Sequence, residues 1–336
     1  MITRIGIRRV LFGLLAAAAT AGGINTATAQ TRTFSFAYDQ PPSTGYGIAA
    51  NLFNAKLKEL SGGNMSINQF PTAQLGEEPQ TLQKMRAGDI DFIITSTANA
   101  STVAPQSGVF SLHYIFRDQA SLTKALADPA ISEEFRAMVK DSVQGAHVLG
   151  LLTLGLRNMY GKKEVKSIDD IKGQKVRVQA TKTEDAHFAA YGAQTVHMVF
   201  TDVYTSLQTG VMNFAENGVN VYLANKHYEV APVLSMTEHE ANMSCLWVSD
   251  KTWNSLTPEQ QKWVQTAAEE VSTREPAMAL KLEKESADKL KTMGVKVVEN
   301  VDKAGFIRIA QPIQDKLAAE LGPHAVKLLK LVRDLK

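Results

Sequence analysis

Apolar residues follow two spacings along this chain, and the switch between them predicts alternating strands and helices. Phe34 and Phe36 stand two residues apart, as on one face of a strand, whereas the apolar positions of 48–60 recur at helical spacing. Further strands are expected near 65–69 and 90–95, with a second helix between them. This order predicts an α/β fold built on a mostly parallel sheet that helices cover.

The same alternation returns after residue 155 and indicates a second unit. Short strands are expected around 176–178, 246–248 and 295–298. At 246–248 we expect the chain to return to the first unit. A chain of 336 residues also exceeds one ordinary hydrophobic core. We therefore predict two interleaved α/β domains with a cleft between them.

A long helix is expected to begin after Thr257, because Pro258 suits the first helical position. Apolar residues recur at helical spacing from 263 to 271, and Pro276 is expected to kink or interrupt this helix. The segment 325–335 is amphipathic and predicts a last helix.

The first 29 residues have the order of charge and hydropathy that is typical of a signal peptide. Three arginines precede the apolar run 10–22, and residues 27–29 read Ala-Thr-Ala, which predicts cleavage after Ala29. The apolar run is too short to span a bilayer, and no later segment approaches 18 apolar residues. We expect an exported, periplasmic protein.

Charge and cysteine content narrow the class of protein further. Removing the leader would remove three arginines and no acidic residue, which takes the formal net charge from +2 to −1. A nearly neutral chain argues against nucleic acid as a partner. Cys245 is the single cysteine and cannot form an internal disulfide, so we expect it to be buried in an apolar strand.

Motifs for catalysis or cofactor binding are absent from the sequence, which contains no P-loop, G-x-G-x-x-G, G-x-S-x-G, C-x-x-C or H-E-x-x-H. Glu238, His239 and Glu240 suggest a metal site at first, but strand alternation would point His239 away from the two glutamates. The seven histidines also show no ligand spacing. We therefore expect no metal, no cofactor and no enzymatic activity.

Two arginines beside apolar strands are the main candidates for binding residues in this chain. Arg177 stands between Val176 and Val178, and Arg157 follows the apolar run 148–155. A guanidinium in such a strand needs an anion, because an unpaired buried charge is very costly. In an exported protein this pattern favours capture of a carboxylate over catalysis.

These features resemble the substrate-binding proteins of TRAP transporters, the DctP-like family. The resemblance extends from Phe34 to about Val332 and depends on the order and spacing of several short segments. The segments are Gln74-Leu-Gly-Glu-Glu78, Gly88-Asp-Ile-Asp91, Phe116-Arg-Asp118, Lys175-Val-Arg177, Tyr204-Thr-Ser-Leu-Gln-Thr-Gly210, Glu216-Asn217, Tyr228-Glu-Val230 and Thr237-Glu-His239.

The resemblance implies a two-domain periplasmic binding protein of type II-like fold. The ligand cleft would lie between the domains, and one long helix would span both. By analogy, domain I would comprise residues 30–154 and 243–282, and domain II would comprise residues 155–242 and 283–336.

The resemblance also implies ligand-binding residues. Arg177 matches the arginine that forks onto the ligand carboxylate, a geometry that suits a planar guanidinium better than lysine. Arg157 matches a second arginine that contacts the ligand or orients the first, and Asn217 matches an asparagine that bonds the carboxylate or a neighbouring hydroxyl. The other implied positions are Phe200, which would pack on the ligand, and Asp39, Glu78, Ser96 and His239, where other members place specificity or cleft residues.

Structural interpretations of these residues stay open. Arg177 could form a structural salt bridge, Asn217 could be a turn residue before Gly218, and Phe200 could belong to the core. The segment 211–218 departs from the family pattern, which leaves the pose of this loop undetermined.

The function implied is that of the periplasmic substrate-binding component of a TRAP transporter. It would capture a hydroxy-acid, sugar acid or dicarboxylate and deliver it to separate small and large permease subunits. Ser96 stands where sialic-acid binders carry a glutamate, which argues against that large sugar acid. The alternatives are a carboxylate-binding protein that serves an ABC importer or a sensor kinase and, less favoured, an exported α/β enzyme.

Overall fold

A mixed sheet runs through residues 31–335, the part of the chain that the computed structural model describes. Its strand order is β2-β1-β3-β8-β4-β7-β5-β6, and β9 pairs with β8. The strands are β1 (Arg32–Ala37), β2 (Met65–Phe70), β3 (Phe92–Ser96), β4 (Ala146–Gly161), β5 (Lys175–Val178), β6 (Gln194–His197), β7 (Phe214–Asn217), β8 (Val233–Ser249) and β9 (Lys296–Val298).

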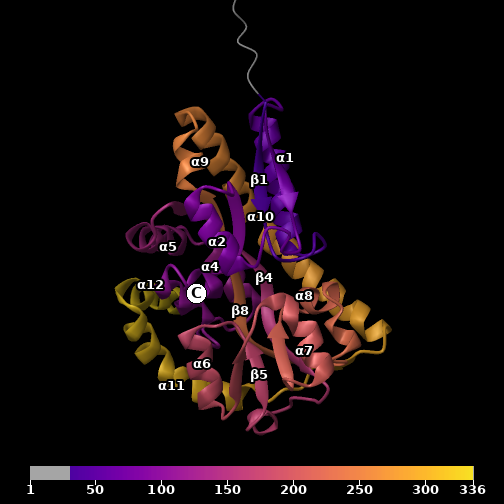
Figure 1. Cartoon of the computed structure of the whole chain (residues 1–336). Helices are drawn as coiled ribbons and strands as arrows, with labels where there is room; N and C mark the ends of the chain where they lie inside the picture. The colour runs from indigo at the N-terminus through magenta and orange to yellow at the C-terminus, as the bar shows by residue number, and fades with distance from the viewer. Residues whose placement is uncertain (1–30, 336) are drawn as a thin grey trace, which may run out of the picture. The chain divides into compact units, whose positions relative to one another are not determined.

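Helices surround this sheet (Figure 1). The α-helices are α1 (Gly45–Leu60), α2 (Glu78–Ala87), α3 (Thr97–Ala100), α4 (Gln119–Ala127), α5 (Pro129–Ser142), α6 (Lys182–Ala190), α7 (Val203–Thr209), α8 (Val219–Ala224), α9 (Asp250–Asn254), α10 (Pro258–Thr292), α11 (Lys303–Leu321) and α12 (Pro323–Asp334). The 3₁₀ turns are η1 (Pro105–Ser111), η2 (Ile168–Ile171), η3 (Phe200–Asp202) and η4 (His227–Glu229). The strands and helices expected from the apolar spacing are confirmed.

The centre of the sheet differs from the prediction of mostly parallel pairing. β1 pairs in parallel with β2 and β3, and β5 pairs in parallel with β6 and β7. Between these groups, β4 and β8 are long antiparallel partners that run through the middle of the described chain (Figure 1). The sheet is mixed because one pair of long strands connects the two parallel groups.

Alternating side chains of the two central strands feed hydrophobic cores on opposite faces of the sheet. From β4, Val148 and Leu151 join one core, while Leu149 and Leu152 join the other. Neighbouring residues of a strand point to opposite faces, so a strand buried on both sides reads as a nearly continuous apolar run. Cys245 lies fully buried in β8, as expected.

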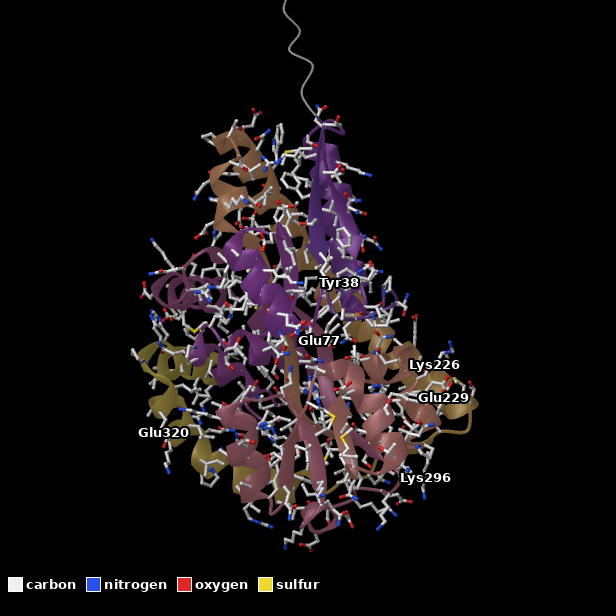
Figure 2. The ribbon with its side chains drawn as sticks, viewed as in Figure 1. Tyr38, Glu77, Lys226, Glu229, Lys296 and Glu320 are labelled. Carbon is white, nitrogen blue, oxygen red and sulfur yellow. The ribbon has the colours of Figure 1, made fainter. Side chains whose placement is uncertain are left out.

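Helix α10 continues through Pro276, so the expected interruption does not occur. The helix begins with a capping box between Thr257 and Gln260. Buried apolar residues on both sides of the proline pack against the sheet and against α1, which holds the helix together where one backbone hydrogen bond is lost. Side chains fill the space between this helix and the strands (Figure 2).

The expected domain boundaries at 154/155 and 242/243 lie inside β4 and β8. Both strands continue through these positions, and the pairing between them shifts register nearby. Gly155 has a φ of 87°, a conformation that other residues rarely adopt. The division into two domains at these residues stays a prediction.

No helix among residues 31–335 is long and apolar enough to cross a membrane. The leader predicted over residues 1–29 lies outside the described part of the chain.

Candidate functional site

A small polar cavity of about 20 Å³ lies between the group of strands around β1–β3 and the group around β5–β7. Both groups and the central strands contribute to its wall. The lining residues are Asp39, Gln40, Tyr46, Glu78, Ser96, Asn99, Leu154, Arg157, Arg177, Gln179, Phe200, Asn217 and Asn242. A larger hollow between 101–108 and 317–321 has charged side chains that are exposed, so the smaller cavity is the better candidate site.

Arg177 is a buried cation without a carboxylate partner among the described residues. β5 places it at the cavity, where its Nε and Nη2 donate to the carbonyl oxygen of Met198 at 3.3 and 2.8 Å. Its guanidinium carbon lies 5.8 Å from the ring centre of Phe200. Burial lowers the pKa of Arg177, Glu216 raises it, and Arg157 lowers it. The guanidinium still stays charged and can bind an anion in the cavity.

Arg157, by contrast, is held by two buried glutamates. Its Nη2 donates to Glu216 Oε1 at 2.6 Å and to the Glu216 carbonyl at 3.0 Å, and its Nε also contacts the same carboxylate. Glu240 Oε2 lies 3.2 Å from Nε. Burial opposes the charge, but Glu216 and Glu240 outweigh it and raise the pKa of Arg157. This arginine is therefore already neutralised within the protein.

Asn217 ends β7 beside the paired arginine. Its Oδ1 accepts hydrogen bonds from the Gly218 amide at 2.9 Å and from Asn242 Nδ2 at 2.8 Å. The side-chain carbonyl is thus fixed, and the side-chain nitrogen stays available as a donor at the cavity wall. The loop before it is fixed by β7, in which Phe214 packs in an apolar core.

Two carboxylates line the opposite side of the cavity. Both oxygens of Glu78 accept hydrogen bonds, whereas one oxygen of Asp39 accepts none from the described residues. Glu78 accepts from Ser96 Oγ and Asn99 Nδ2 at 2.8 Å each and from the Tyr46 hydroxyl at 3.2 Å. Asp39 Oδ1 is buried and accepts no hydrogen bond from the described residues. Burial raises the pKa of Asp39 well above its usual range, and Glu78 raises it further.

One hydrogen bond connects the two sides across the cavity. Gln179 Nε2, in the residue after β5 of one strand group, donates to Ser96 Oγ at the end of β3 in the other, at 2.8 Å. A comparable link joins Asn225 Nδ2 to Gln40 Oε1 at 3.0 Å. These amides bring the two walls together at the cavity.

The structure brings together all but one of the predicted site residues. His239 does not line the cavity, and its Nε2 lies 3.7 Å from Glu216 Oε2 on the far side of Arg157. The residues that do line it are Asp39, Glu78, Ser96, Arg157, Arg177, Phe200 and Asn217.

The sequence analysis missed six lining residues. Gln179 could have been found, because it stands two residues after Arg177 and strand alternation points both to one face. The others come from separate segments whose approach no local pattern reveals. They are Gln40, Tyr46, Asn99, Leu154 and Asn242.

A cleft in a mixed α/β fold with an uncompensated arginine and several polar amides defines a solute-binding protein. Residues 36–321 match DctP, the bacterial extracellular solute-binding protein family 7, and the chain belongs to this family. Its members are the periplasmic solute-binding proteins of TRAP transporters.

Similar proteins are known over nearly the whole chain. The 2,3-diketo-L-gulonate-binding periplasmic protein YiaO of Escherichia coli K12 is 26% identical over 331 residues, which cover 98% of this chain and 99% of that protein. A TRAP periplasmic solute-binding protein from Xanthobacter autotrophicus Py2, solved with bound β-D-galacturonate, has a TM-score of 0.84 and 28% identity. That comparison covers 90% of this chain and 100% of the other.

A second solved structure comes from Chromohalobacter salexigens, with bound D-glucuronate. It has a TM-score of 0.83 and 28% identity, and the comparison covers 90% of this chain and 99% of that one. The fold is therefore that of the TRAP solute-binding proteins.

Proposed function

We propose that the cavity binds a sugar acid with one carboxylate, of the uronate or aldonate kind. The observation that carries this proposal is the buried Arg177, which has no carboxylate partner among the described residues while Arg157 has two. A ligand carboxylate supplies the missing anion and forms charge-assisted hydrogen bonds to the guanidinium.

The opposite wall favours hydroxyl groups on the rest of the ligand. Asp39 has a buried oxygen that lacks a donor, and a ligand hydroxyl can donate to it. A second ligand carboxylate would instead add a third acidic group beside Asp39 and Glu78, whose pKa values are already raised by burial, and its ionised form would be disfavoured there. This arrangement favours a hydroxylated monocarboxylate over a dicarboxylate.

The remaining lining residues suit the same ligand class. Asn217 offers a donor, Gln179 and Asn99 add amides, and Phe200 gives an apolar face beside Arg177. The ligands in the related structures, β-D-galacturonate and D-glucuronate, are sugar acids of this class. His239 has no direct role in this proposal.

The protein would act by capture and release, without chemical conversion of the ligand. The leader would direct it to the periplasm, where the closed, ligand-bound form would dock on separate TRAP permease subunits. Ligand contacts to both walls would favour closure, because only a difference in affinity between two states can shift their populations.

Calorimetric titration with D-glucuronate, D-galacturonate and succinate tests this function. We expect at least one sugar acid to bind and succinate to bind more weakly. Arg177→Ala should weaken binding at least about 100-fold, since two hydrogen bonds to a charged group contribute about 1.5–3 kcal/mol each. Arg177→Lys should restore only part of the affinity, because lysine lacks the planar fork.

Arg274→Ala is the matched control, since Arg274 is exposed on α10 and pairs with Glu270. It should bind as the wild type does. Tight binding of succinate without any sugar acid would contradict the hydroxyl-binding role of Asp39. Equal affinity of the Arg177→Ala variant and the wild type would contradict the carboxylate site itself.

A further inference from the structure

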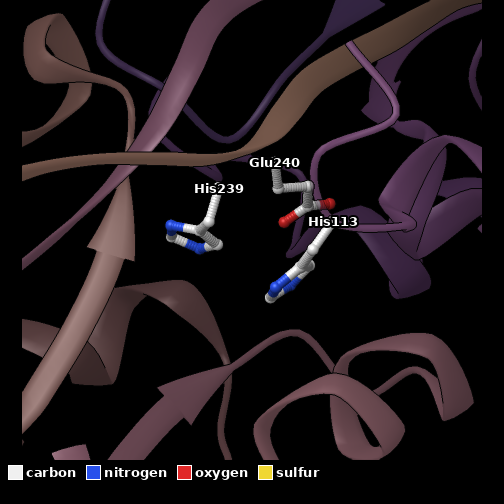
Figure 3. A group of neighbouring side chains, drawn as sticks. All are labelled: His113, His239 and Glu240. Atoms are coloured by element: carbon white, nitrogen blue, oxygen red, sulfur yellow. The ribbon is translucent and has the colours of Figure 1, made fainter. Parts of the chain in front are cut away.

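A second polar cluster lies behind Arg157, outside the cavity. His113 belongs to the loop between η1 and α4, and His239 and Glu240 are neighbours in β8. One ligand atom from each of the three side chains lies within 4.8 Å of the other two. In Figure 3 the two imidazole rings and the carboxylate face the same small space. All three side chains are at most 3% exposed.

Strand alternation, which would point His239 away from Glu238 and Glu240, does not hold at residues 238–240, because the strand is irregular there. Glu238 has a φ of 44°, and the pairing of β8 with β4 is irregular between Arg157 and Met159. A residue in this conformation changes the direction of the side chains that follow it. His239 and Glu240 therefore both reach the buried cluster.

Several buried atoms in the cluster lack hydrogen bonds from the described residues. They are His113 Nε2, His239 Nε2, Glu240 Oε2, His187 Nδ1 and both carboxylate oxygens of Glu184. Buried polar groups almost always have partners, so this concentration in one place points to a missing ligand. His113 Nε2 and Glu184 Oε1 lie 3.4 Å apart without hydrogen-bond geometry.

The other nitrogen of each imidazole is already engaged. His113 Nδ1 lies 3.0 Å from the Tyr191 hydroxyl, and His239 Nδ1 lies 2.8 Å from Thr237 Oγ1. Metal-binding histidines are typically oriented in this way by an oxygen at the second nitrogen. The Nε2 atoms are thereby turned toward the carboxyl groups of the cluster, His113 Nε2 toward Glu184 and His239 Nε2 toward Glu216 at 3.7 Å.

The charges of the cluster also favour a cation. Glu184, Glu216 and Glu240 are buried, and Arg157 is the positive side chain among them. Three buried acidic groups thus face one guanidinium, and a divalent ion can bind to this excess of acidic groups.

We propose that His113, His239 and Glu240 bind a divalent metal ion of the zinc type, with Glu184 as a fourth ligand. Two imidazoles and carboxylate oxygens form a common donor set for zinc, whose bonds of about 2.0–2.1 Å place tetrahedral ligands about 3.4 Å apart. A separation of 4.8 Å must therefore shrink by about 1.4 Å, which rotations of the three side chains would supply. The ion would fix Glu240, and through it the orientation of Arg157 beside the cavity.

Zinc binding to the whole purified protein tests this site. After removal of metals with a chelator, the protein is unfolded and refolded with zinc, because the cluster is closed to solvent in the folded state. We expect one zinc per chain by elemental analysis after dialysis. With cobalt in place of zinc, we expect the visible absorption bands of a tetrahedral site.

His113→Gln and Glu240→Gln should each weaken zinc binding at least about 100-fold, more than the loss of a second-shell partner usually costs. His324→Gln is the control, because His324 lies partly exposed between Glu134 and Asp141 and is the competing place for zinc. It should keep the full zinc content.

Crystals of the wild-type protein grown after refolding with zinc locate the ion by anomalous scattering, without any variant. A peak within bonding distance of His113 and His239 would support the proposal. Loss of zinc in the His324→Gln variant alone, or zinc-treated crystals without a peak at the cluster, would overturn it.

Discussion

Arg157 and Arg177 are equally buried, yet their partners give them different roles. Glu216 and Glu240 pair with Arg157, whereas Arg177 donates to a carbonyl oxygen, lies beside an aromatic ring and has no carboxylate partner among residues 31–335. A buried cation that lacks an anion can bind an anionic ligand, whereas a buried ion pair holds the two residues that form it in place. The difference supports the proposed roles, in which Arg157 is structural and Arg177 binds the ligand.

Replacement of Glu216 by glutamine tests the supporting role. Glu216→Gln leaves Arg157 with a weaker partner set, so we expect the free energy of unfolding to fall by about 3 kcal/mol, as when one partner of a buried pair is removed. Urea denaturation measures this change. Glu299→Gln, which breaks an exposed pair with Lys291, should cost much less, because solvent screens that pair. Similar losses in the two variants would contradict a structural role for Glu216.

The sequence predicted Arg177 well because its neighbours in the strand already imply burial. It did not predict the partner of Arg157, since Glu216 comes from β7, 59 residues along the chain. Which carboxylate meets which arginine depends on the pairing of β4 with β7. No local pattern carries that information.

Among the elements, β8 is a long strand with an irregular backbone at one residue. Glu238 has a left-handed backbone inside an otherwise extended strand, and its side chain pairs with Lys303 near the surface. Non-glycine residues pay about 1–2 kcal/mol for this conformation. The irregular point lies beside His239 and Glu240, so it decides where they point.

Two substitutions of Glu238 measure the energetic cost of its left-handed backbone conformation. Glu238→Ala and Glu238→Gly both remove the ion pair with Lys303, so their difference reports the conformation alone. We expect the glycine variant to be more stable than the alanine variant by about 1 kcal/mol in urea denaturation. At Gln194, an exposed position in β6, the order should be the opposite, with alanine more stable. The same order at both positions would contradict strain at Glu238.

Most elements were predictable from apolar spacing, and the exceptions have a common cause. The antiparallel pairing of β4 and β8 and the continuity of α10 at Pro276 both depend on packing between distant segments. Local propensity says little about such packing. The histidine cluster was missed for a local reason, because strict alternation does not hold at Glu238.

At the scale of the whole molecule, α10 contributes buried acids to the central strand β4 and to the start of α8. Glu275 Oε2 accepts from the Thr153 amide at 3.1 Å, and Glu283 accepts from the Val219 and Asn220 amides at 2.7 and 2.6 Å. Burial raises the pKa of Glu283 to about 8 and raises that of Glu275 well above its usual range. One helix thus connects the central strand β4 with α8.

These acids predict how stability depends on pH. The folded state keeps the proton of Glu283 up to about pH 8, whereas the unfolded chain releases it near pH 4.3. The contribution of Glu283 to the free energy of unfolding is fully present below about pH 4.3 and is lost as the pH rises to 8. The loss is on the order of a few kcal/mol. Urea midpoints at pH 5 and pH 8 measure the loss. Glu283→Gln should reduce it, and an unchanged loss in this variant would contradict the assignment.

The strand order has a consequence for how the chain folds. β3 is separated by about 150 residues from its partner β8, and α10, which covers α1, follows later still. The sheet begun by β1, β2 and β3 therefore keeps an open edge until the chain has been made as far as Ser249. At about 5–20 residues per second, synthesis of that stretch takes roughly 8–30 s. Pairing over such distances is also slow in itself. For a member of a periplasmic family such a delay would be useful, because a polypeptide that cannot complete its sheet early would still be unfolded when it crosses a membrane.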